Sequence, residues 1–250
     1  MSVVFCVAIR KNLLVIPLPD YSATESGCLY VVATPIGNLE DITLRALRTL
    51  RECELIAAED TRRTSRLLAH YNIKKRLLSL HRFSEASRIP ELISLLQEGI
   101  KVALVSDAGT PGISDPGERF IKMCLDCNIP VVAVPGPSAV LHALVVSGLN
   151  TTPFLFRGFL PIKKAARMHA LKELCESIYT SVFFESPHRL VQTISDLNSL
   201  VPQRKICIAR ELSKLHEEVT RGTVTSVAEK ILKSLPRGEY TIVLEGAQEP

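Results

Sequence analysis

The sequence predicts an α/β protein in two parts, with a mostly parallel sheet in the N-terminal part and a mixed sheet in the C-terminal part. From Leu29 onward, short apolar runs alternate with amphipathic stretches, which is the pattern of strands that alternate with helices. The first-half strands are apolar almost throughout, as is typical of parallel strands buried on both faces. In the second half several strands follow one another without a helix between them, and this indicates a mixed sheet.

The first half contains five apolar runs of strand length, separated by stretches with apolar residues at helical spacing. The predicted strands are Leu29–Thr34, Leu55–Ala58, Leu77–Leu80, Val102–Ser106 and Val131–Val134. The predicted helices are Ile42–Arg51, Arg62–His70, Ile89–Gln97, Gly117–Cys127 and Ser138–Val146. Their regular alternation predicts one unit built around a mostly parallel sheet.

The second half begins after a cluster of turn residues, Ser147–Pro153, which predicts a domain boundary. Its predicted strands are Phe154–Arg157, Thr180–Phe184, Lys205–Arg210, Glu217–Arg221 and Tyr240–Leu244. Its predicted helices are Lys163–Cys175, Arg189–Leu200 and Val224–Leu235. We therefore expect an N-terminal extension (1–28), an N-terminal α/β domain (29–148) and a C-terminal α/β domain (149–250).

Composition restricts the class of protein. The chain has 250 residues, of which 46% are hydrophobic and 22% charged, and this is a globular composition. No apolar run reaches the roughly 18 residues of a membrane span, so no membrane association and no secretory signal are expected. The seven cysteines are scattered and odd in number, which favours reduced thiols in a cytoplasm. The six histidines lack the spacing of metal ligands, so no metal is expected.

The net charge of +4 conceals a local block of basic residues. Between Arg62 and Arg88 there are eight basic residues and one acid, so this segment carries +7 and the remainder of the chain −3. A block of this kind can bind phosphates and attract a polyanion. It is equally compatible with the solvated face of a helix.

Three loops at predicted strand ends have unusual composition. The segment Ser106–Gly117 contains three glycines, two prolines and two aspartates in twelve residues. The loops Ala33–Leu39 and Pro135–Ala139 also combine glycine and proline before a helix. Because ligands of open α/β sheets bind beyond the carboxyl ends of the strands, the three loops predict a cleft for a nucleoside-like ligand. The alternative is a set of helix caps, and none of the loops is a G-x-G-x-x-G dinucleotide motif.

These loops resemble the tetrapyrrole-methylase superfamily, and within it the bacterial branch that methylates the ribose 2′-hydroxyl of a cytidine in the decoding region of 16S rRNA. The matching segments are Thr34–Thr43, Ala57–Arg62, Ser106–Gly117, Pro135–Ser138, Phe156–Pro161, Phe183–Arg189, Ala209–Lys214, Glu217–Glu218 and Gly238–Gly246. They occur in order over residues 29–246. Residues 1–28 precede the usual start. The chain ends where relatives usually carry a small helical region, and we expect the lack of that region to weaken rRNA docking.

The resemblance implies a two-domain methyltransferase that binds S-adenosylmethionine in the cleft between its domains and forms a homodimer. The cofactor-binding residues that it implies are Pro35, Ser106, Asp107, Ala108, Gly109, Ser138, Ala139, Phe184, Glu185, Ser186, Gly238 and Glu239. The basic block then becomes a surface for the phosphates of 16S rRNA in the small ribosomal subunit, through Arg62, Arg63, Arg66, Lys74, Lys75, Arg76 and Arg82.

Transfer of a methyl group to a ribose hydroxyl also requires a group that accepts the hydroxyl proton. The candidates are Asp60, Glu211 and Lys214, with His81 as a weaker one. Each has a structural alternative, because Asp60 can pair with the neighbouring Arg62, and Glu211 and Lys214 can form part of an interdomain salt-bridge network.

Three other functions remain open at this point. One is methylation of a corrin or porphyrin precursor, although a small acidic macrocycle does not require a block of seven positive charges. A second is methylation of a protein side chain. The third is a non-catalytic rRNA-binding assembly factor that holds S-adenosylmethionine only as a structural ligand.

Overall fold

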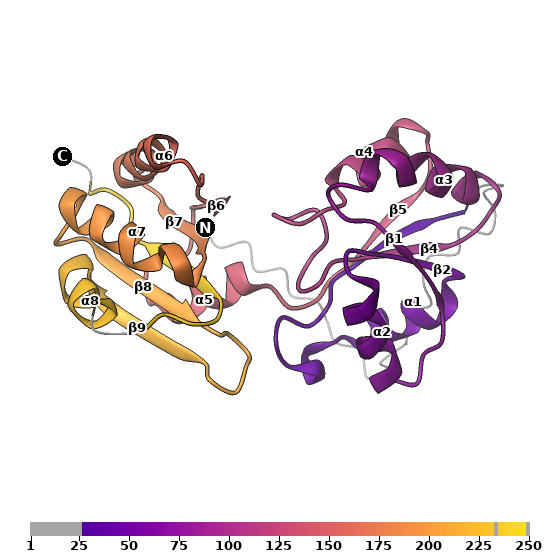
Figure 1. The fold of residues 1–250 in the computed structure, drawn as a ribbon, viewed down its shortest axis with the longest axis horizontal. Helices are drawn as coiled ribbons and strands as arrows, with labels where there is room; N and C mark the ends of the chain where they lie inside the picture. Colours follow the sequence, from indigo (N-terminus) through magenta and orange to yellow (C-terminus); the bar gives the residue numbers. More distant parts are fainter. Residues whose placement is uncertain (1–26, 233–234, 249–250) are drawn as a thin grey trace, which may run out of the picture.

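The computed structural model describes residues 27–232 and 235–248, and it contains two five-stranded sheets, each with its own helices (Figure 1). Most of the predicted N-terminal extension, residues 1–26, lies outside the described residues. The two halves lie side by side, with the earlier part of the chain in one and the later part in the other (Figure 1). The expected α/β fold, parallel in the first half and mixed in the second, is confirmed.

The first sheet has the strand order β3-β2-β4-β1-β5, and all neighbouring strands are parallel. Its strands are β1 (Leu29–Val32), β2 (Leu55–Ala58), β3 (Arg76–Ser79), β4 (Val102–Val105) and β5 (Val131–Val134). Every residue of β1, β2 and β4 is buried. The continuous apolar runs of these strands are explained by helices that cover both faces of the sheet.

Four α-helices and one 3-10 helix accompany the first sheet. They are η1 (Leu39–Asp41), α1 (Leu44–Glu52), α2 (Thr61–His70), α3 (Glu85–Gln97) and α4 (Glu118–Asp126). Leu50 of α1 and Leu68 of α2 join the core on one face, whereas Leu92 of α3 and Phe120 of α4 join the core on the other. The first half is thus a three-layer unit, with α3 and α4 opposite α1 and α2 (Figure 1).

The second sheet has the order β6-β7-β10-β8-β9, and only the pair β6 and β7 is parallel. Its strands are β6 (Phe154–Phe159), β7 (Thr180–Glu185), β8 (Lys205–Arg210), β9 (Glu218–Thr223) and β10 (Tyr240–Leu244). The helices are α5 (Ala139–Ser147), α6 (Lys164–Glu176), α7 (Pro187–Leu200) and α8 (Val224–Ile231).

The two faces of the second sheet are covered differently. Helices α6, α7 and α8 form the core on one face. On the other face lies α5, whose Ala143 and Leu144 pack against Val182, Cys207 and other residues of the central strands. Helix α5 precedes the expected domain boundary at residue 148 yet lies on the second sheet. The boundary itself stays a prediction.

One predicted helix start is wrong by a full turn. Helix α3 begins at Glu85 rather than at Ile89, which places Pro90 inside the helix. Proline is favoured in the first turn of a helix, whereas Pro90 lies beyond the first turn of α3. Pro90 and Ala86 lie on the exposed face of the helix, where water can solvate the Ala86 carbonyl that proline leaves without an N–H donor. Helix α7 likewise begins two residues earlier than predicted, with Pro187 in its first turn.

Candidate active site

The candidate site lies at the point where the connections of the first sheet change direction. Strands β1 and β4 are neighbours, but the chain leaves β1 toward β2 on one side and leaves β4 toward β5 on the other. Ligands of open α/β sheets bind at such switch points. Here the two loops are joined, because Thr34 and Gly109 exchange backbone hydrogen bonds of 2.9 and 3.0 Å, and the Thr34 hydroxyl donates to the Ser106 carbonyl at 3.2 Å.

The loop after β5 packs directly on the loop after β1. A Cβ atom at Gly136 would lie 2.9 Å from the Cβ of Ala33, so only glycine permits this approach. The close neighbour of Gly136 is thus another loop of the protein. Ser138 then caps α5 by accepting a hydrogen bond from the Leu141 N–H at 3.4 Å.

A cleft of about 550 Å³ is lined by residues of both halves. Ten of the twelve predicted cofactor-binding residues line it, namely Asp107, Ala108, Gly109, Ser138, Ala139, Phe184, Glu185, Ser186, Gly238 and Glu239. The other two, Pro35 and Ser106, line a smaller neighbouring pocket. The structure therefore brings the predicted residues together at one place, and their binding role stays a prediction.

The second half supplies an aromatic wall to this cleft. The rings of Phe156 and Phe159 lie 5.2 and 5.3 Å from the ring of Phe184, measured between centroids. All three side chains line the cleft. Sequence reasoning selected only Phe184, because Phe156 and Phe159 lie on the bulged strand β6, whose irregular register no sequence pattern shows.

The first half supplies a group of carboxylates. Glu59, at the end of β2, accepts a hydrogen bond from the Asp107 N–H at 3.2 Å, and burial raises the pKa of Glu59. Asp115 also lines the cleft; burial, with the nearby charge of Glu59, raises its pKa to about 7. Neither Glu59 nor Asp115 was among the predicted site residues. The sequence signal that points to them is their position after strands that end at the same edge of the sheet.

The carboxylate of Glu185 is bound by side chains of the second half of the molecule, to which Glu185 itself belongs. Glu185 is only 1% exposed, its Oε1 lies 2.7 Å from Nη2 of Arg189, and its Oε2 accepts a hydrogen bond of 2.7 Å from the Thr193 hydroxyl. Arg189 also donates to the Leu160 carbonyl at 2.9 Å. This arrangement fixes the turn from β7 into α7 and with it the backbone that lines the cleft.

Asp60, the first candidate proton acceptor, pairs with Arg62 and caps α2. Its Oδ1 accepts the Arg62 N–H at 2.8 Å, and its Oδ2 lies 2.7 Å from Nη2 of Arg62. The hydrogen bonds from Arg62 hold the pKa of Asp60 well below its usual range. Asp60 is not among the residues that line the cleft. The structural alternative for Asp60, which is pairing with Arg62, is thus present in the molecule.

Lys214 and Glu211 form a network with Glu239. The Lys214 Nζ lies 2.9 Å from Oε1 of Glu211 and 3.1 Å from Oε2 of Glu239. Burial by itself would lower the pKa of Lys214, but the hydrogen bonds to the two carboxylates outweigh it and raise the pKa. The hydrogen bond from Lys214 lowers the pKa of Glu211. Lys214 is therefore protonated at neutral pH and has no free lone pair to accept a proton.

His81, the weaker candidate, is exposed and follows β3. Its Nδ1 accepts a hydrogen bond from the Phe83 N–H at 3.2 Å. It lines neither the cleft nor the smaller pocket.

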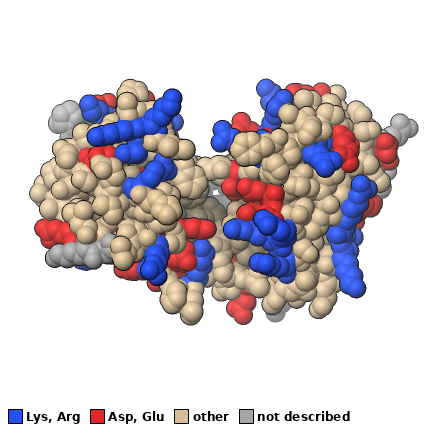
Figure 2. All heavy atoms as spheres, viewed as in Figure 1, with Lys and Arg blue, Asp and Glu red and all other residues tan. Residues whose placement is uncertain are grey.

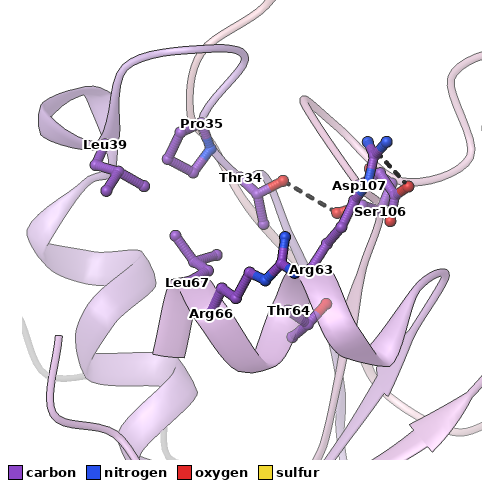
Figure 3. A pocket seen from close by; sticks show the side chains of 9 residues that line it. All are labelled: Thr34, Pro35, Leu39, Arg63, Thr64, Arg66, Leu67, Ser106 and Asp107. Atoms are coloured by element: carbon purple, nitrogen blue, oxygen red, sulfur yellow. Dashed lines mark hydrogen bonds and ion pairs between the residues drawn. The ribbon is translucent and has the colours of Figure 1, made fainter. Parts of the chain in front are cut away.

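The smaller pocket, of about 260 Å³, lies beside the cleft and shares Arg63 and Asp107 with it (Figure 3). The Arg63 guanidinium lies 3.3 Å from Oδ2 of Asp107, so this ion pair stands at the border of the two spaces. Figure 3 shows Arg63 reaching from α2 to Asp107, with Leu67 between α2 and the loop that carries Pro35 and Leu39.

The predicted RNA-binding residues fall at two different edges of the first sheet. Arg62, Arg63 and Arg66 lie in the first turns of α2, at the carboxyl edge beside the cleft, and Arg82 follows β3 at the same edge. Lys74, Lys75 and Arg76 precede or begin β3 and lie at the opposite edge. Figure 2 shows basic side chains beside the central hollow of the molecule and others distant from it. Of the first group, Arg63 lines the cleft and Arg66 lines the smaller pocket, whereas no residue of the second group lines either space.

Within the described residues, no group of three or more His, Cys, Asp or Glu side chains is placed to hold a metal ion. Among the helices of residues 27–232 and 235–248, none is both long enough and apolar enough to cross a membrane.

The two sheets and the cleft at the switch point define an α/β protein with a cleft between two halves of different topology, of a size that suits a small ligand. The chain belongs to the family of Tetrapyrrole (Corrin/Porphyrin) Methylases, whose family model matches residues 28–228. This confirms the family that the motifs indicated.

Among its relatives, the chain is 51% identical over 222 residues to Ribosomal RNA small subunit methyltransferase I of Thermotoga maritima, with 89% of this chain and 100% of that protein covered. It is 46% identical over 222 residues to the protein of the same name from Synechocystis sp., with 88% and 80% covered. The Thermotoga relative is matched along its whole length, so this relative has no helical region beyond the matched part.

Solved structures agree on the fold. The methyltransferase CobJ is 16% identical, with a TM-score of 0.68 and coverage of 89% of this chain and 95% of that chain. Uroporphyrin-III C-methyl transferase from Thermus thermophilus, complexed with S-adenyl homocysteine, is 20% identical, with a TM-score of 0.59 and coverage of 88% and 97%. At these identities the likeness concerns the fold alone.

Proposed function

We propose that this protein is an S-adenosylmethionine-dependent methyltransferase that methylates the ribose 2′-hydroxyl of a cytidine in the decoding region of 16S rRNA. The observation that carries the proposal is the identity of 51% to a ribosomal RNA small subunit methyltransferase over that relative's full length. The cleft at the switch point supports it, because the family motifs meet there.

The residues of the cleft fit S-adenosylmethionine, which carries a positive sulfonium and an ammonium group beside a flat adenine. A volume of about 550 Å³ is suitable for a ligand of this size. Glu59 and Asp107 would face the positive groups, and Phe156 and Phe184 offer an apolar surface to the adenine. When bound, the cofactor supplies an electrophilic methyl group.

The protein must then align the ribose hydroxyl and accept its proton. Alignment alone is worth on the order of 7–11 kcal/mol in well-oriented reactions. Lys214 is already protonated, and Asp60, paired with Arg62, is a weak base. We assign proton acceptance to Asp115, because it lines the cleft and burial raises its pKa to about 7. Glu211 and Lys214 then act by holding Glu239 at the cleft.

The basic residues at the carboxyl edge would bind rRNA phosphates near the target nucleotide, and those at the opposite edge would bind phosphates farther away.

We further propose that the enzyme acts in the cytoplasm, where its ribosomal substrate is found, and as a homodimer. The homodimer is what the resemblance to the tetrapyrrole methylases implies. Sedimentation equilibrium tests the dimer, and a monomer at micromolar concentration contradicts it.

The function is tested by transfer of labelled methyl groups. The protein is incubated with S-adenosylmethionine and, separately, with undermethylated 30S subunits, free 16S rRNA or a corrin precursor, and the product is mapped. We expect label on a cytidine ribose of 16S rRNA. Label on the macrocycle alone would contradict the proposal, and cofactor binding without any transfer would indicate a non-catalytic assembly factor.

A further inference from the structure

We infer that the smaller pocket beside the cleft holds the nucleotide that is methylated, with its pyrimidine base on an apolar floor and its phosphate on two arginines. The inference rests on the proposed function and adds the seat of the substrate to it. The pocket measures about 260 Å³, and of the cofactor-binding residues that the family resemblance implies, only Pro35, Ser106 and Asp107 line it, whereas ten line the larger cleft. Its position is the first argument, because it shares Arg63 and Asp107 with the larger cleft.

The floor of the pocket is apolar and built from three separate elements. Pro35 comes from the loop after β1, Leu39 from η1 and Leu67 from α2. Leu39 is 39% exposed, so an apolar surface is left open to solvent here. The Tyr71 hydroxyl donates a hydrogen bond to the Leu39 carbonyl and thereby ties η1 to the end of α2. A rigid apolar surface of this kind suits the face of a flat base.

The wall of the pocket is basic. Arg63 and Arg66 lie one helical turn apart on α2, and both line the pocket. Both are exposed, and in Figure 3 their side chains lie above the helix on the pocket side. Two guanidinium groups at this spacing favour a phosphate, which accepts charge-assisted hydrogen bonds from both.

The border between pocket and cleft is where a ribose would lie. Arg63, Arg66 and Asp107 all line the pocket, and a nucleotide whose phosphate lies on the two arginines would have its ribose near the Arg63–Asp107 ion pair. The same ion pair lines the cleft that we assign to the cofactor. A ribose at this border would open onto the cleft, so that its 2′-hydroxyl could approach the methyl donor directly, as transfer requires.

The pocket itself is tested with cytidine 5′-monophosphate, without any methyl transfer. Binding is measured by NMR titration of the full-length wild-type protein, of Arg66→Ala and of the control Arg119→Ala, an exposed arginine of α4 on the opposite face of the sheet. We expect Arg66→Ala to weaken binding about tenfold, as the loss of one charge-assisted contact predicts, and Arg119→Ala to leave it unchanged. Equal affinity of wild type and Arg66→Ala overturns the inference.

The same titration is repeated with S-adenosylhomocysteine at saturation. If the nucleotide lies in the smaller pocket, the occupied cleft leaves its affinity unchanged or improves it. Competition between the two ligands would place the nucleotide in the cofactor cleft and overturn the inference. Neither measurement depends on turnover. The assignment of the pocket can therefore be refuted while methyl transfer is confirmed, and methyl transfer can be refuted while the assignment of the pocket is confirmed.

A double-mutant cycle then tests the base. The substrates are 30S particles that carry either cytidine or an abasic ribose at the target position, and the proteins are wild type and Leu39→Ala. The exposed position of Leu39 makes its truncation compatible with folding. If the floor holds the base, Leu39→Ala and the abasic substrate each lower kcat/KM several-fold, and the combination lowers it no further. Additive effects contradict a contact between base and floor.

Discussion

At the scale of the residue, two aspartates of the same region differ in chemistry because their surroundings differ. Asp60 receives hydrogen bonds from Arg62, which lower its pKa, whereas Asp115 is partly buried near Glu59, which raises its pKa to about 7. A carboxylate that is stabilised by an arginine binds a proton weakly. A carboxylate near another negative charge and away from water binds it more tightly. A position near the family motifs therefore identifies candidate proton acceptors, and pairing or burial decides how strongly each carboxylate binds a proton.

The first prediction concerns Asp115 and pH. Proton acceptance requires the ionised form, so kcat/KM for S-adenosylmethionine should rise with pH and level off above the pKa of about 7. Asp115→Asn should lower kcat by about 10²-fold or more and remove this rise. The comparison is Asp60→Asn, which should keep the pH dependence of the wild type. A wild-type profile in Asp115→Asn would refute the assignment.

The second prediction concerns the ion pair of Arg189 and Glu185. Arg189→Ala leaves a buried carboxylate without its cation, and breaking such a pair costs about 3–5 kcal/mol of unfolding free energy. The matched control is Arg88→Ala, whose pair with Glu91 is exposed and should contribute about 1 kcal/mol or less. Urea unfolding of both variants measures the difference. Similar losses would mean that Glu185 is not held by Arg189 as described.

At the scale of the element, the direction of each strand and helix decides where charges lie. Helix α2 begins at the carboxyl edge of the first sheet, and the chain crosses to the other edge before β3 begins. The basic block from Arg62 to Arg88 is continuous in sequence but is divided between the two edges. Its first part and Arg82 lie at the carboxyl edge, where Arg63 lines the cleft.

The third prediction separates these two groups of charges. Arg66→Glu with Arg82→Glu changes the net charge by as much as Lys74→Glu with Lys75→Glu, so nonspecific electrostatics are matched. The first pair lies at the carboxyl edge and should lower both kcat and 30S affinity, whereas the second pair should raise KM alone. Each lost phosphate contact lowers the salt slope of binding by about 0.7–0.9. Equal kinetic effects of the two pairs would argue against the division.

At the scale of the whole molecule, contacts between the halves close one side of the cleft. The Ser213 hydroxyl donates to the Asp41 carboxylate, and a Cβ at Gly37 would lie 2.3 Å from Cγ of Lys214. Leu212 and Ile36, from opposite halves, share one core cluster and line the cleft together. The volume of the cleft is thus set by how closely the two halves approach.

The fourth prediction tests this approach. Gly37→Ala adds a methyl group against Lys214 and 3.1 Å from the Leu212 carbonyl, so the halves must separate slightly. Overpacking of this kind costs about 1–3 kcal/mol, and we expect the dissociation constant of S-adenosylhomocysteine to rise about tenfold, as calorimetry would show. Combination with Lys214→Ala removes the clash and should restore part of the affinity. Unchanged affinity in Gly37→Ala would show that the contact does not set the cleft.

By itself the sequence determined the type and order of the elements, because hydrophobic periodicity reflects near neighbours along the chain. It also determined that three glycine- and proline-rich loops meet at one sheet edge, since parallel strands place their carboxyl ends together. The predicted start of α3 was wrong because apolar spacing marks only the buried face of a helix, and the first turn of α3, from Glu85 to Arg88, carries no buried residue.

Only the tertiary structure decided which carboxylate is buried, which arginine is paired and which charges lie beside the cleft. Burial and pairing depend on residues that are distant in sequence, such as Glu59 beside Asp107 and Lys214 against Gly37. The packing of α5 on the second sheet and the pocket beside α2 have the same origin. The sequence identified the loops that form the site, whereas long-range packing set the protonation and spacing of the groups within it.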